Sequence, residues 1–327
     1  MYRFHLQRLT RRVAHAALPL LVMTLWAGCS DSPRLPFGTF EKHDGNPILL
    51  PQGSTWESKD VYNPAAWTDG ERVYLLYRAE DSTDVGPKLG TSRIGLAMST
   101  DGYRFEREPE PVFVPTEPWE LPGGVEDPRV VRIDSTFYLT YTAYDGQTAR
   151  LALASSPDLR TWTKHGLVFP ERGWTKSGAI LAEPVDGRYW MYFGDTNIWA
   201  AHSEDLLHWT VVEEPVLQPR PGMFDERLVE PGPPPLMTEN GILLLYNGAD
   251  SSLVYESGWA LLDPNDPTRV TARSDTSFLQ PSAELERGGQ VPNVVFIEGL
   301  VPFRDQWLLY YGMGDSGIGV AVAEQDR

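Results

Sequence analysis

One strand-like pattern recurs five times along the chain, and this internal repeat restricts the possible folds more than any other feature. The recurring runs are rich in aromatic and β-branched residues and lie between turns rich in Gly, Pro, Asp and Asn, which is typical of β-strands. A recurrence every roughly 50–65 residues indicates a repeat architecture. The runs begin at Val73 (VYLLYRA), Phe137 (FYLTYTA), Tyr189 (YWMYFGD), Ile242 (ILLLYNGA) and Trp307 (WLLYYGMG).

Further strand-like segments flank each run. An apolar segment with a polar entrance precedes every run, and a third apolar segment follows it; the preceding segments read VYNPAAW, GVEDPRVV, KSGAILAEPV, LVEPGPPPL and NVVFIEGLV. Five repeats of about four strands predict an all-β fold, a five-bladed β-propeller, over residues 39–327. The alternative, a pair of β-sandwiches, does not give this period. Because the last repeat supplies only three strands, we expect residues 46–50 (NPILL) to add the fourth and close the ring.

Three of the repeats continue into their fourth strand through a similar turn. The turns read STDGYRF, SPDLRTW and SEDLLHW, each with an aspartate and an aromatic residue shortly after it. Asp side chains readily bond the backbone of such turns. We therefore predict structural roles for Asp101, Asp158 and Asp205.

The N-terminus has the features of a targeting segment. Four arginines and no acidic residue precede an apolar stretch over residues 13–26, and Ala27 and Gly28 are small. Residues 1–28 therefore read as a signal peptide. LWAGC resembles a lipobox, in which Cys29 would be lipidated, so we expect an exported, membrane-anchored lipoprotein, periplasmic or at the cell surface; a simple secreted protein is the alternative. Residues 29–38 are predicted to be a tether, and the single cysteine excludes a disulfide within the chain.

The charge balance restricts the partners of the predicted mature part. Without the four arginines of the signal, 24 basic residues face 45 acidic ones, a net charge of −21. Nucleic acids and anionic lipids are poor partners for such a protein, so any membrane contact would pass through the lipid at Cys29. A neutral ligand such as a sugar is compatible. No metal-ligand spacing is evident, and we expect neither a metal nor an organic cofactor.

The polar strand entrances point to one functional site. In a propeller the first strand of each blade lines the central channel, so polar groups at these strand ends converge. Carboxylates and amides bind sugar hydroxyls, and paired carboxylates cleave glycosidic bonds. The alternative is that the charges only solvate a wet channel. The residues that we expect to meet there are Asp60, Asn63, Glu126, Asp127, Arg129, Lys176, Glu183, Glu230 and Glu298.

A set of ordered motifs resembles glycoside hydrolase family 130, which contains β-mannoside phosphorylases and β-mannosidases. The motifs are YNPAA, YLLYRAE, GVEDPR, LASSPDLRTW, GPPPLMTENGILLLYNGA, GWALLDPNDP, VPNVVF and LLYYGMGD, in the order of the family and over nearly the whole predicted mature chain. The resemblance implies a five-bladed propeller, in agreement with the repeat. It also implies an enzyme that acts on oligosaccharides or other glycosides.

The resemblance assigns roles to individual residues. Asp127 matches the general acid, which in the phosphorylases acts through a sugar hydroxyl; beside Glu126 in a closed funnel we expect its pKa to be raised. Asn63 and Asp315 match positions that hold the sugar, and Asp60, Glu126 and Arg129 are further candidates for substrate binding. The residues that match the phosphate-binding positions of the phosphorylases are Arg78, Arg150 and Lys176; for the last two an ion pair with a carboxylate of the funnel is the alternative.

Two departures from the phosphorylase pattern suggest hydrolysis. Glu230 stands where the phosphorylases usually have glycine, and Glu298 where they usually have a small residue. Either could be the base that activates water, or a substrate or structural contact. Inverting hydrolysis, with Asp127 as the acid, requires carboxyl groups about 6.5–9.5 Å apart. Export also favours water over phosphate as the acceptor. The alternatives are a β-mannoside phosphorylase with inorganic phosphate as co-substrate and a non-catalytic carbohydrate-binding lipoprotein.

Overall fold

The computed structural model describes residues 33–82 and 90–325. The predicted signal peptide and Cys29 lie outside the described residues, so the lipid anchor stays a prediction. Within the described part, strands dominate, and the helical elements are two short turns, η1 (Pro118–Glu120) and α1 (Glu284–Gly288). None of the helices described is long and apolar enough to cross a membrane.

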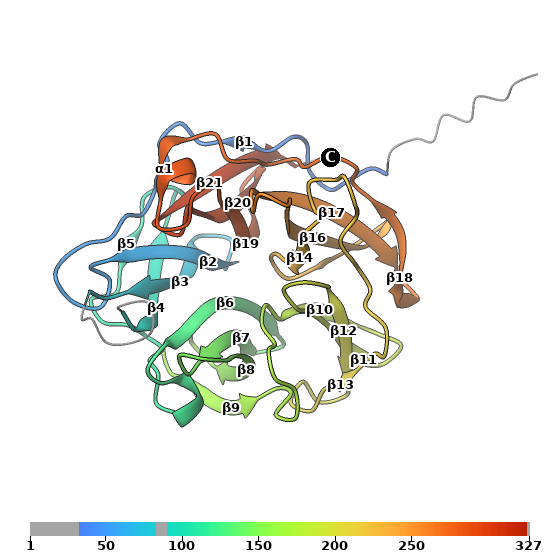
Figure 1. Ribbon diagram of the computed structural model, residues 1–327, viewed down its shortest axis with the longest axis horizontal. Coiled ribbons are helices and arrows are strands. Elements are labelled where there is room, and N and C mark those ends of the chain that lie inside the picture. Colours follow the sequence, from blue (N-terminus) through green and yellow to red (C-terminus); the bar gives the residue numbers. More distant parts are fainter. Residues whose placement is uncertain (1–32, 83–89, 326–327) are drawn as a thin grey trace, which may run out of the picture. The chain divides into compact units, whose positions relative to one another are not determined.

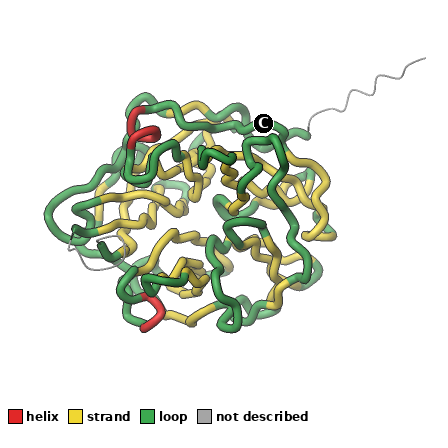
Figure 2. Tube along the Cα trace, viewed as in Figure 1, coloured by secondary structure: helices red, strands yellow, loops and turns green. Residues whose placement is uncertain are grey.

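The strands form five antiparallel units of four main strands each, arranged around a central axis (Figures 1 and 2). The first is β2 (Asp60–Thr68), β3 (Val73–Glu80), β4 (Ser92–Ser99) and β5 (Glu106–Arg107), and the second is β6 (Gly124–Ile133), β7 (Thr136–Tyr144), β8 (Ala149–Ser156) and β9 (Thr163–Leu167). The third is β10 (Ala179–Val185), β11 (Arg188–Phe193), β12 (Trp199–Ser203) and β13 (Thr210–Val211). The fourth is β14 (Leu228–Pro231), β16 (Gly241–Ala249), β17 (Tyr255–Asp263) and β18 (Asp266–Arg273), with β15 (Leu236–Thr238) beside β16. The fifth is β19 (Val295–Phe303), β20 (Gln306–Met313), β21 (Gly317–Glu324) and β1 (Glu41–Lys42). The five-bladed propeller predicted from the repeat is confirmed.

The closing strand lies upstream of the predicted one. β1 pairs with β21 through Glu41 and Lys42, and residues 46–50 contribute only the bridge between Leu49 and Ile318. The reason lies at Asn46, whose side-chain amide exchanges hydrogen bonds of 2.9 Å with both backbone groups of Val320 and so replaces ladder pairing there. The predicted tether is also shorter than expected, because Phe37 bridges to Gln325 and packs in the core.

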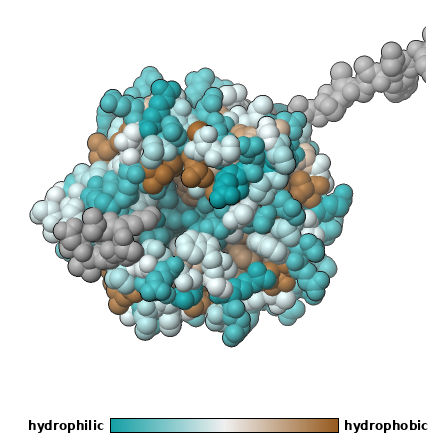
Figure 3. Space-filling view, viewed as in Figure 1, coloured by the Kyte–Doolittle hydropathy of each residue, from teal (hydrophilic) through white to brown (hydrophobic). Residues whose placement is uncertain are grey.

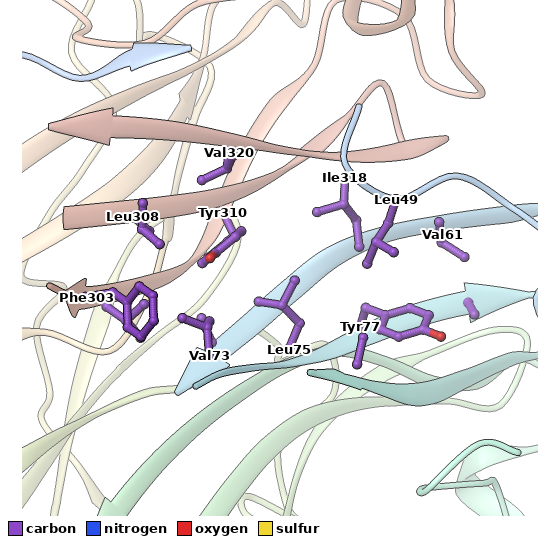
Figure 4. Close-up of a cluster of buried hydrophobic side chains, with 14 of the residues drawn as sticks. Leu49, Val61, Val73, Leu75, Tyr77, Phe303, Leu308, Tyr310, Ile318 and Val320 are labelled. Carbon is purple, nitrogen blue, oxygen red and sulfur yellow. The ribbon is translucent and has the colours of Figure 1, made fainter. Parts of the chain in front are cut away.

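The hydrophobic core is divided among the blade interfaces. Five clusters of buried residues each join strands from two adjacent blades, and together they run around the whole ring. Figure 4 shows the cluster that closes it, in which Val61 and Leu75 of the first blade meet Tyr310 and Ile318 of the fifth. Neighbouring residues of one strand point into different interfaces: Leu75 faces this cluster and Leu76 the next. Strands buried on both faces explain why the repeat reads as continuous apolar runs.

A buried polar cluster repeats in four of the blades. In each, a tyrosine of the second strand donates to a buried carboxylate, which also pairs with a cation from a strand or loop nearby. The clusters are Tyr77–Glu57–Arg107, Tyr141–Glu120–Lys164, Tyr246–Asp225–Arg273 and Tyr311–Glu286–Lys42. The third blade has Phe193 at the tyrosine position, and this ring packs 4.5 Å from Phe169. The repeat is therefore broken in one blade.

The predicted turn aspartates have structural roles. One side-chain oxygen of each accepts hydrogen bonds of 2.7–2.9 Å from two backbone amides two and three residues further along the chain. Asp101, Asp158 and Asp205 thus stabilise the turns between the third and fourth strands, as expected.

Candidate active site

The first strands of the blades surround a cavity of about 240 Å³. Its charged and amide side chains are those of Asn63, Arg78, Glu126, Asp127, Lys176, Glu230 and Asp315, and Thr142 adds a hydroxyl that the sequence did not predict. All seven were predicted from the sequence, and the structure brings them together. In the space-filling view the face in front is hollowed toward the middle of the ring, with hydrophilic side chains around much of the hollow (Figure 3). The volume lies just below the roughly 300–1,000 Å³ of small-molecule sites.

Strand register decides which residues reach this cavity. In each blade, one residue of the first strand, or of the segment that enters it, lies opposite the same position of the second strand. In the second strands this position is occupied by Arg78, Thr142, Gly194, Asn247 and Gly312. The residues at this level are Tyr62, Glu126, Lys176, Glu230 and Phe296, and all but Tyr62 line the cavity. The sequence thus places one residue per blade in a ring around the axis.

Backbone bulges turn the next residues toward the axis. Asn63 and Asp127 lie where the pairing register of β2 and β6 shifts, and both have a positive φ of 47°. A bulged residue has no ladder partner, so its side chain is re-aimed. The Asn63 side-chain amide donates to Asp127 Oδ1 at 2.9 Å, so the bulges of two neighbouring blades fix the position of this carboxylate.

Arg78 is the cation of the first blade, and carboxylates surround it. Its guanidinium lies 2.7 Å from Glu80, 2.8 Å from Glu126 and 3.1 Å from Asp127. Burial alone would lower its pKa, but these carboxylates raise it well above its ordinary value. Arg78 is therefore charged at every pH of interest and holds Asp127 from one side.

Lys176 stands between the two carboxylates of greatest interest. Its Nζ lies 3.1 Å from Glu230 Oε1 and 3.7 Å from Asp127 Oδ2, so these two oxygens are no further apart than the sum of the two distances. This upper limit lies near the lower end of the separation of about 6.5–9.5 Å found in inverting glycosidases and above the roughly 5–5.5 Å of retaining ones, so the two distances do not by themselves select between the two stereochemistries. Ser177 donates a hydrogen bond to the same oxygen of Glu230.

The pKa values of the two carboxyls move in opposite directions. Burial raises the pKa of Glu230 above its ordinary value, although Lys176 and Arg129 oppose the shift. Burial also favours the neutral form of Asp127, but Arg78, Lys176 and Asn63 outweigh it and hold the pKa of Asp127 below its ordinary range. The expectation of a raised pKa at Asp127 is therefore wrong, because the cations of the first and third blades lower this pKa by more than burial raises it.

Glu298 and Arg129 do not line the cavity, contrary to expectation. Glu298 lies at a bulge in β19 two residues beyond Phe296, and Arg129 lies opposite Thr140, at a similar depth. Both side chains are fully buried, 1 % exposed or less, and pair at 3.0 Å. Burial raises the pKa of Glu298 well above its ordinary value. Of the two glutamates predicted as the base, only Glu230 lines the cavity, and it is therefore the better candidate.

Three other predicted residues lie outside the cavity lining. Arg150 forms an ion pair of 2.7 Å with Asp145, which does not line the cavity either, so neither the phosphate-binding role nor the expected pair with a carboxylate of the funnel is seen for it. Asp60 is buried beside Lys59 at the end of β2, two residues from the ring level. Glu183 is exposed near the far end of β10. None of the three is among the described residues that line the cavity.

Aromatic side chains complete the lining, and sequence reasoning named none of them. They are Tyr144, Trp174, Tyr255 and Phe296. Tyr144 ends a repeated strand and Phe296 occupies the ring level, so the alignment of the repeats contained the signal that would have identified both. Tyr255 begins the third strand of the fourth blade, whereas Trp174 lies outside the repeated strands. Among the described residues no group of His, Cys, Asp or Glu has a metal-binding arrangement.

Comparison with known proteins agrees with this geometry. A family model for glycoside hydrolase 130, described as β-1,4-mannooligosaccharide phosphorylase, matches residues 39–327. The chain belongs to glycoside hydrolase family 130. It is therefore an enzyme of a family that acts on β-mannosidic linkages, and the resemblance inferred from the motifs is confirmed.

Similar proteins within family 130 include phosphorylases and structures linked to hydrolases. A 1,2-β-oligomannan phosphorylase of Thermoanaerobacter sp. (strain X514) is 38 % identical over 85 % of this chain and 95 % of its own. A solved structure from work reporting that this family of mannoside phosphorylases contains hydrolases targeting β-1,2 mannosidic linkages in Candida mannan is 40 % identical, with a TM-score of 0.85 over 90 % of this chain and 98 % of the other. The β-1,2-mannobiose phosphorylase of Listeria innocua in complex with β-1,2-mannobiose is 26 % identical, with a TM-score of 0.78 over 87 % and 96 %.

Proposed function

We propose that this family 130 enzyme hydrolyses β-1,2-mannosidic bonds with inversion of configuration. The observation that carries the proposal is the position of Glu230, which lines the cavity with Asp127 and is separated from it by Lys176. The phosphorylase pattern usually has glycine at this position, where no side chain could act as a base. The choice of mannose as the sugar and of β-1,2 as the linkage is inferred from the similar proteins.

The charge of the cavity supports water rather than phosphate as the acceptor. Among the described residues that line it, four carboxylates face two cations. Glu126 and Asp127 already pair with Arg78, and Glu230 pairs with Lys176. A phosphate dianion would have to displace these carboxylates from the cations and then remain close to them, which is electrostatically unfavourable. A neutral sugar and a water molecule meet no such barrier.

The proposed reaction is a single displacement. Glu230 takes a proton from a water molecule while the water oxygen attacks the anomeric carbon, and the bond from that carbon to the leaving oxygen breaks. Asp127 supplies the proton that the leaving oxygen needs, directly or through a sugar hydroxyl. The product is the α-anomer of the released sugar.

Asp127 must gain a proton before it can act as an acid. The contacts with Arg78 and Lys176 favour its ionised form. A substrate that draws either cation toward its own hydroxyls weakens this stabilisation and raises the pKa of Asp127. Substrate binding and proton uptake by Asp127 are therefore coupled in this mechanism.

Phosphorolysis is the second candidate, and two observations favour it. Arg78 and Lys176, which match phosphate-binding positions of the phosphorylases, both line the cavity. The curated relatives from Thermoanaerobacter and Listeria innocua are phosphorylases. In that case inorganic phosphate would replace water as the attacking group, with Asp127 still the acid. No feature of the described residues favours the third hypothesis, a carbohydrate-binding protein without activity.

Chemical rescue tests the two roles separately. Asp127→Asn is expected to abolish cleavage of β-1,2-mannobiose but to retain activity on a 4-nitrophenyl β-mannoside, whose leaving group needs no proton. Glu230→Gln is expected to lose both activities and to regain turnover with azide, which attacks without a base. If Glu230→Gln cleaves β-1,2-mannobiose as fast as the wild type, the assignment of the base is wrong.

We also propose that the enzyme acts outside the cytoplasm, anchored through a lipid on Cys29. The basic, apolar and small-residue pattern of residues 1–29 supports this. Labelling with a radioactive fatty acid in a bacterial host is expected to mark the wild type and not Cys29→Ala. Labelling of both or of neither would contradict the anchor.

A further inference from the structure

A second hollow of about 410 Å³ lies beside the cavity on the third blade. Its walls come from residues 172–175, which enter the blade, and from residues 193–199, which join β11 to β12. Trp174 lines both the cavity and this hollow. The two spaces therefore share one wall, and a chain-like ligand in the cavity has an adjacent place to continue. We call the second hollow the third-blade groove.

The side chains of the third-blade groove have the chemistry of a sugar site. Trp174 is 55 % exposed, more than the other exposed large hydrophobic residues of the described chain, and its indole N–H donates to Asp195. Trp199 is half-buried, and the guanidinium of Arg172 lies 5.6 Å from its ring centre. Asn197 adds an amide. The two aromatic rings lie beside a cationic, an anionic and an amide side chain, which together donate and accept hydrogen bonds. This combination suits a neutral polyhydroxyl ligand better than an anion or an apolar ligand.

The third blade is also the one whose rim is lowered. In the repeat alignment the second strands of the other blades run two or three residues beyond the position of Phe193 on the cavity side, to Glu80, Tyr144, Ala249 and Met313, whereas β11 ends at Phe193. Three strand residues correspond to about 10 Å of sheet. This is the blade that lacks the buried tyrosine–carboxylate cluster. The groove thus occupies the place where the repeat departs from its pattern.

We propose that the third-blade groove is a distal subsite that binds sugar units of a β-mannan oligosaccharide beyond the two that flank the cleaved bond. The proposal rests on the proposed function for its substrate class. Trp174 is the platform common to the cavity and the groove, and Trp199 with Arg172 forms the far wall. The enzyme should therefore prefer oligosaccharides longer than the disaccharide.

The test compares chain lengths in the purified full-length protein. For the wild type, kcat/KM should rise from β-1,2-mannobiose to the tetrasaccharide. Trp199→Ala should lower kcat/KM for the tetrasaccharide by up to about tenfold, the effect of losing one aromatic contact, and leave the disaccharide unchanged. Arg172→Ala, at an exposed loop position, should have a smaller effect in the same direction and serves if Trp199→Ala does not fold. Leu207→Ala, exposed elsewhere on this blade, is the matched control.

The proposed subsite would be refuted by either of two results. One is an equal kcat/KM for all chain lengths in the wild type, and the other is an equal loss of kcat/KM on disaccharide and tetrasaccharide in both variants. If no β-mannoside is cleaved, the proposed function fails, and the groove is then tested by calorimetry with intact oligosaccharides and Asp127→Asn. Tighter binding of the tetrasaccharide that disappears with Arg172→Ala supports it. Equal binding of both lengths refutes it.

Discussion

The buried pair below the cavity gives a stability prediction that follows directly from the structure. Arg129 is 1 % exposed and lies 3.0 Å from Glu298, whose side chain is not exposed. The same guanidinium donates to the backbone carbonyls of Pro231 at 2.7 Å and Gly232 at 2.8 Å. Arg129 thus joins the second, fourth and fifth blades beneath the two candidate catalytic carboxyls.

Arg129→Met should destabilise the protein strongly. It leaves two backbone carbonyls without a donor and deprives Glu298 of its cation. Because burial already raises the pKa of this carboxyl well above its ordinary value, Glu298 binds a proton more readily in the variant. Removing one partner of a buried ion pair costs about 3–5 kcal/mol, and this proton uptake places the loss toward the lower end of that range. At about 2–4 °C per kcal/mol for domains of 150–250 residues, Tm should fall by roughly 6–20 °C, toward the lower end for this larger domain. Differential scanning calorimetry measures the change.

A mutant cycle separates this pair from general damage. In Arg129→Met/Glu298→Gln the remaining side chain is neutral at every pH, whereas Glu298 of the single variant must bind a proton to become neutral. The double variant should therefore melt above Arg129→Met, by a margin that grows as the pH rises. Arg160→Met is the exposed control, because Arg160 is 43 % exposed beside Glu108 and such pairs contribute about 0–1 kcal/mol. The reasoning is refuted if Arg129→Met melts within about 2 °C of the wild type, or if the double variant is no more stable than the single one.

Three further variants test the site and the repeat. Lys176→Met removes a cation that lowers the pKa values of Glu230 and Asp127. Both pKa values should therefore rise, and the pH–rate profile should move to higher pH. An unchanged profile would contradict the placement of Lys176. Arg150→Ala should leave kcat/KM almost unchanged whether or not phosphate is present, and a large loss would return Arg150 to the site. Tyr141→Phe leaves buried Glu120 without one donor and should lower stability by about 1–3 kcal/mol in chemical denaturation, whereas no change would show that this cluster is not stabilising.

The fold and the ring of polar residues could be predicted because they depend on the repeat. Aligning the aromatic runs places Asn63, Asp127 and Glu230 at strand entrances, and a propeller brings such entrances together. The depth of each residue could not be predicted, because it depends on register. Glu230-Pro231 and Glu298-Gly299 look alike in sequence, yet the bulge in β19 moves Glu298 below the cavity floor.

Charge effects between blades were equally hidden. The expected rise in the pKa of Asp127 considered its neighbour in sequence, Glu126, whereas the cations that control it come from other blades. Trp174 was missed for a related reason, since it belongs to an entering loop and not to a repeated strand. Contacts across blade boundaries are long-range in sequence, and the repeat alone does not contain them.

Product analysis on β-1,2-mannobiose with and without inorganic phosphate tests the proposed hydrolysis most directly. Incubation in buffer enriched in H₂¹⁸O, followed by mass spectrometry and by NMR of the first-formed anomer, identifies both the acceptor and the stereochemistry. We expect free α-mannose that carries one ¹⁸O atom, released at the same rate whether phosphate is present or not. Strict dependence on phosphate with mannose 1-phosphate as the product would contradict hydrolysis and establish phosphorolysis instead.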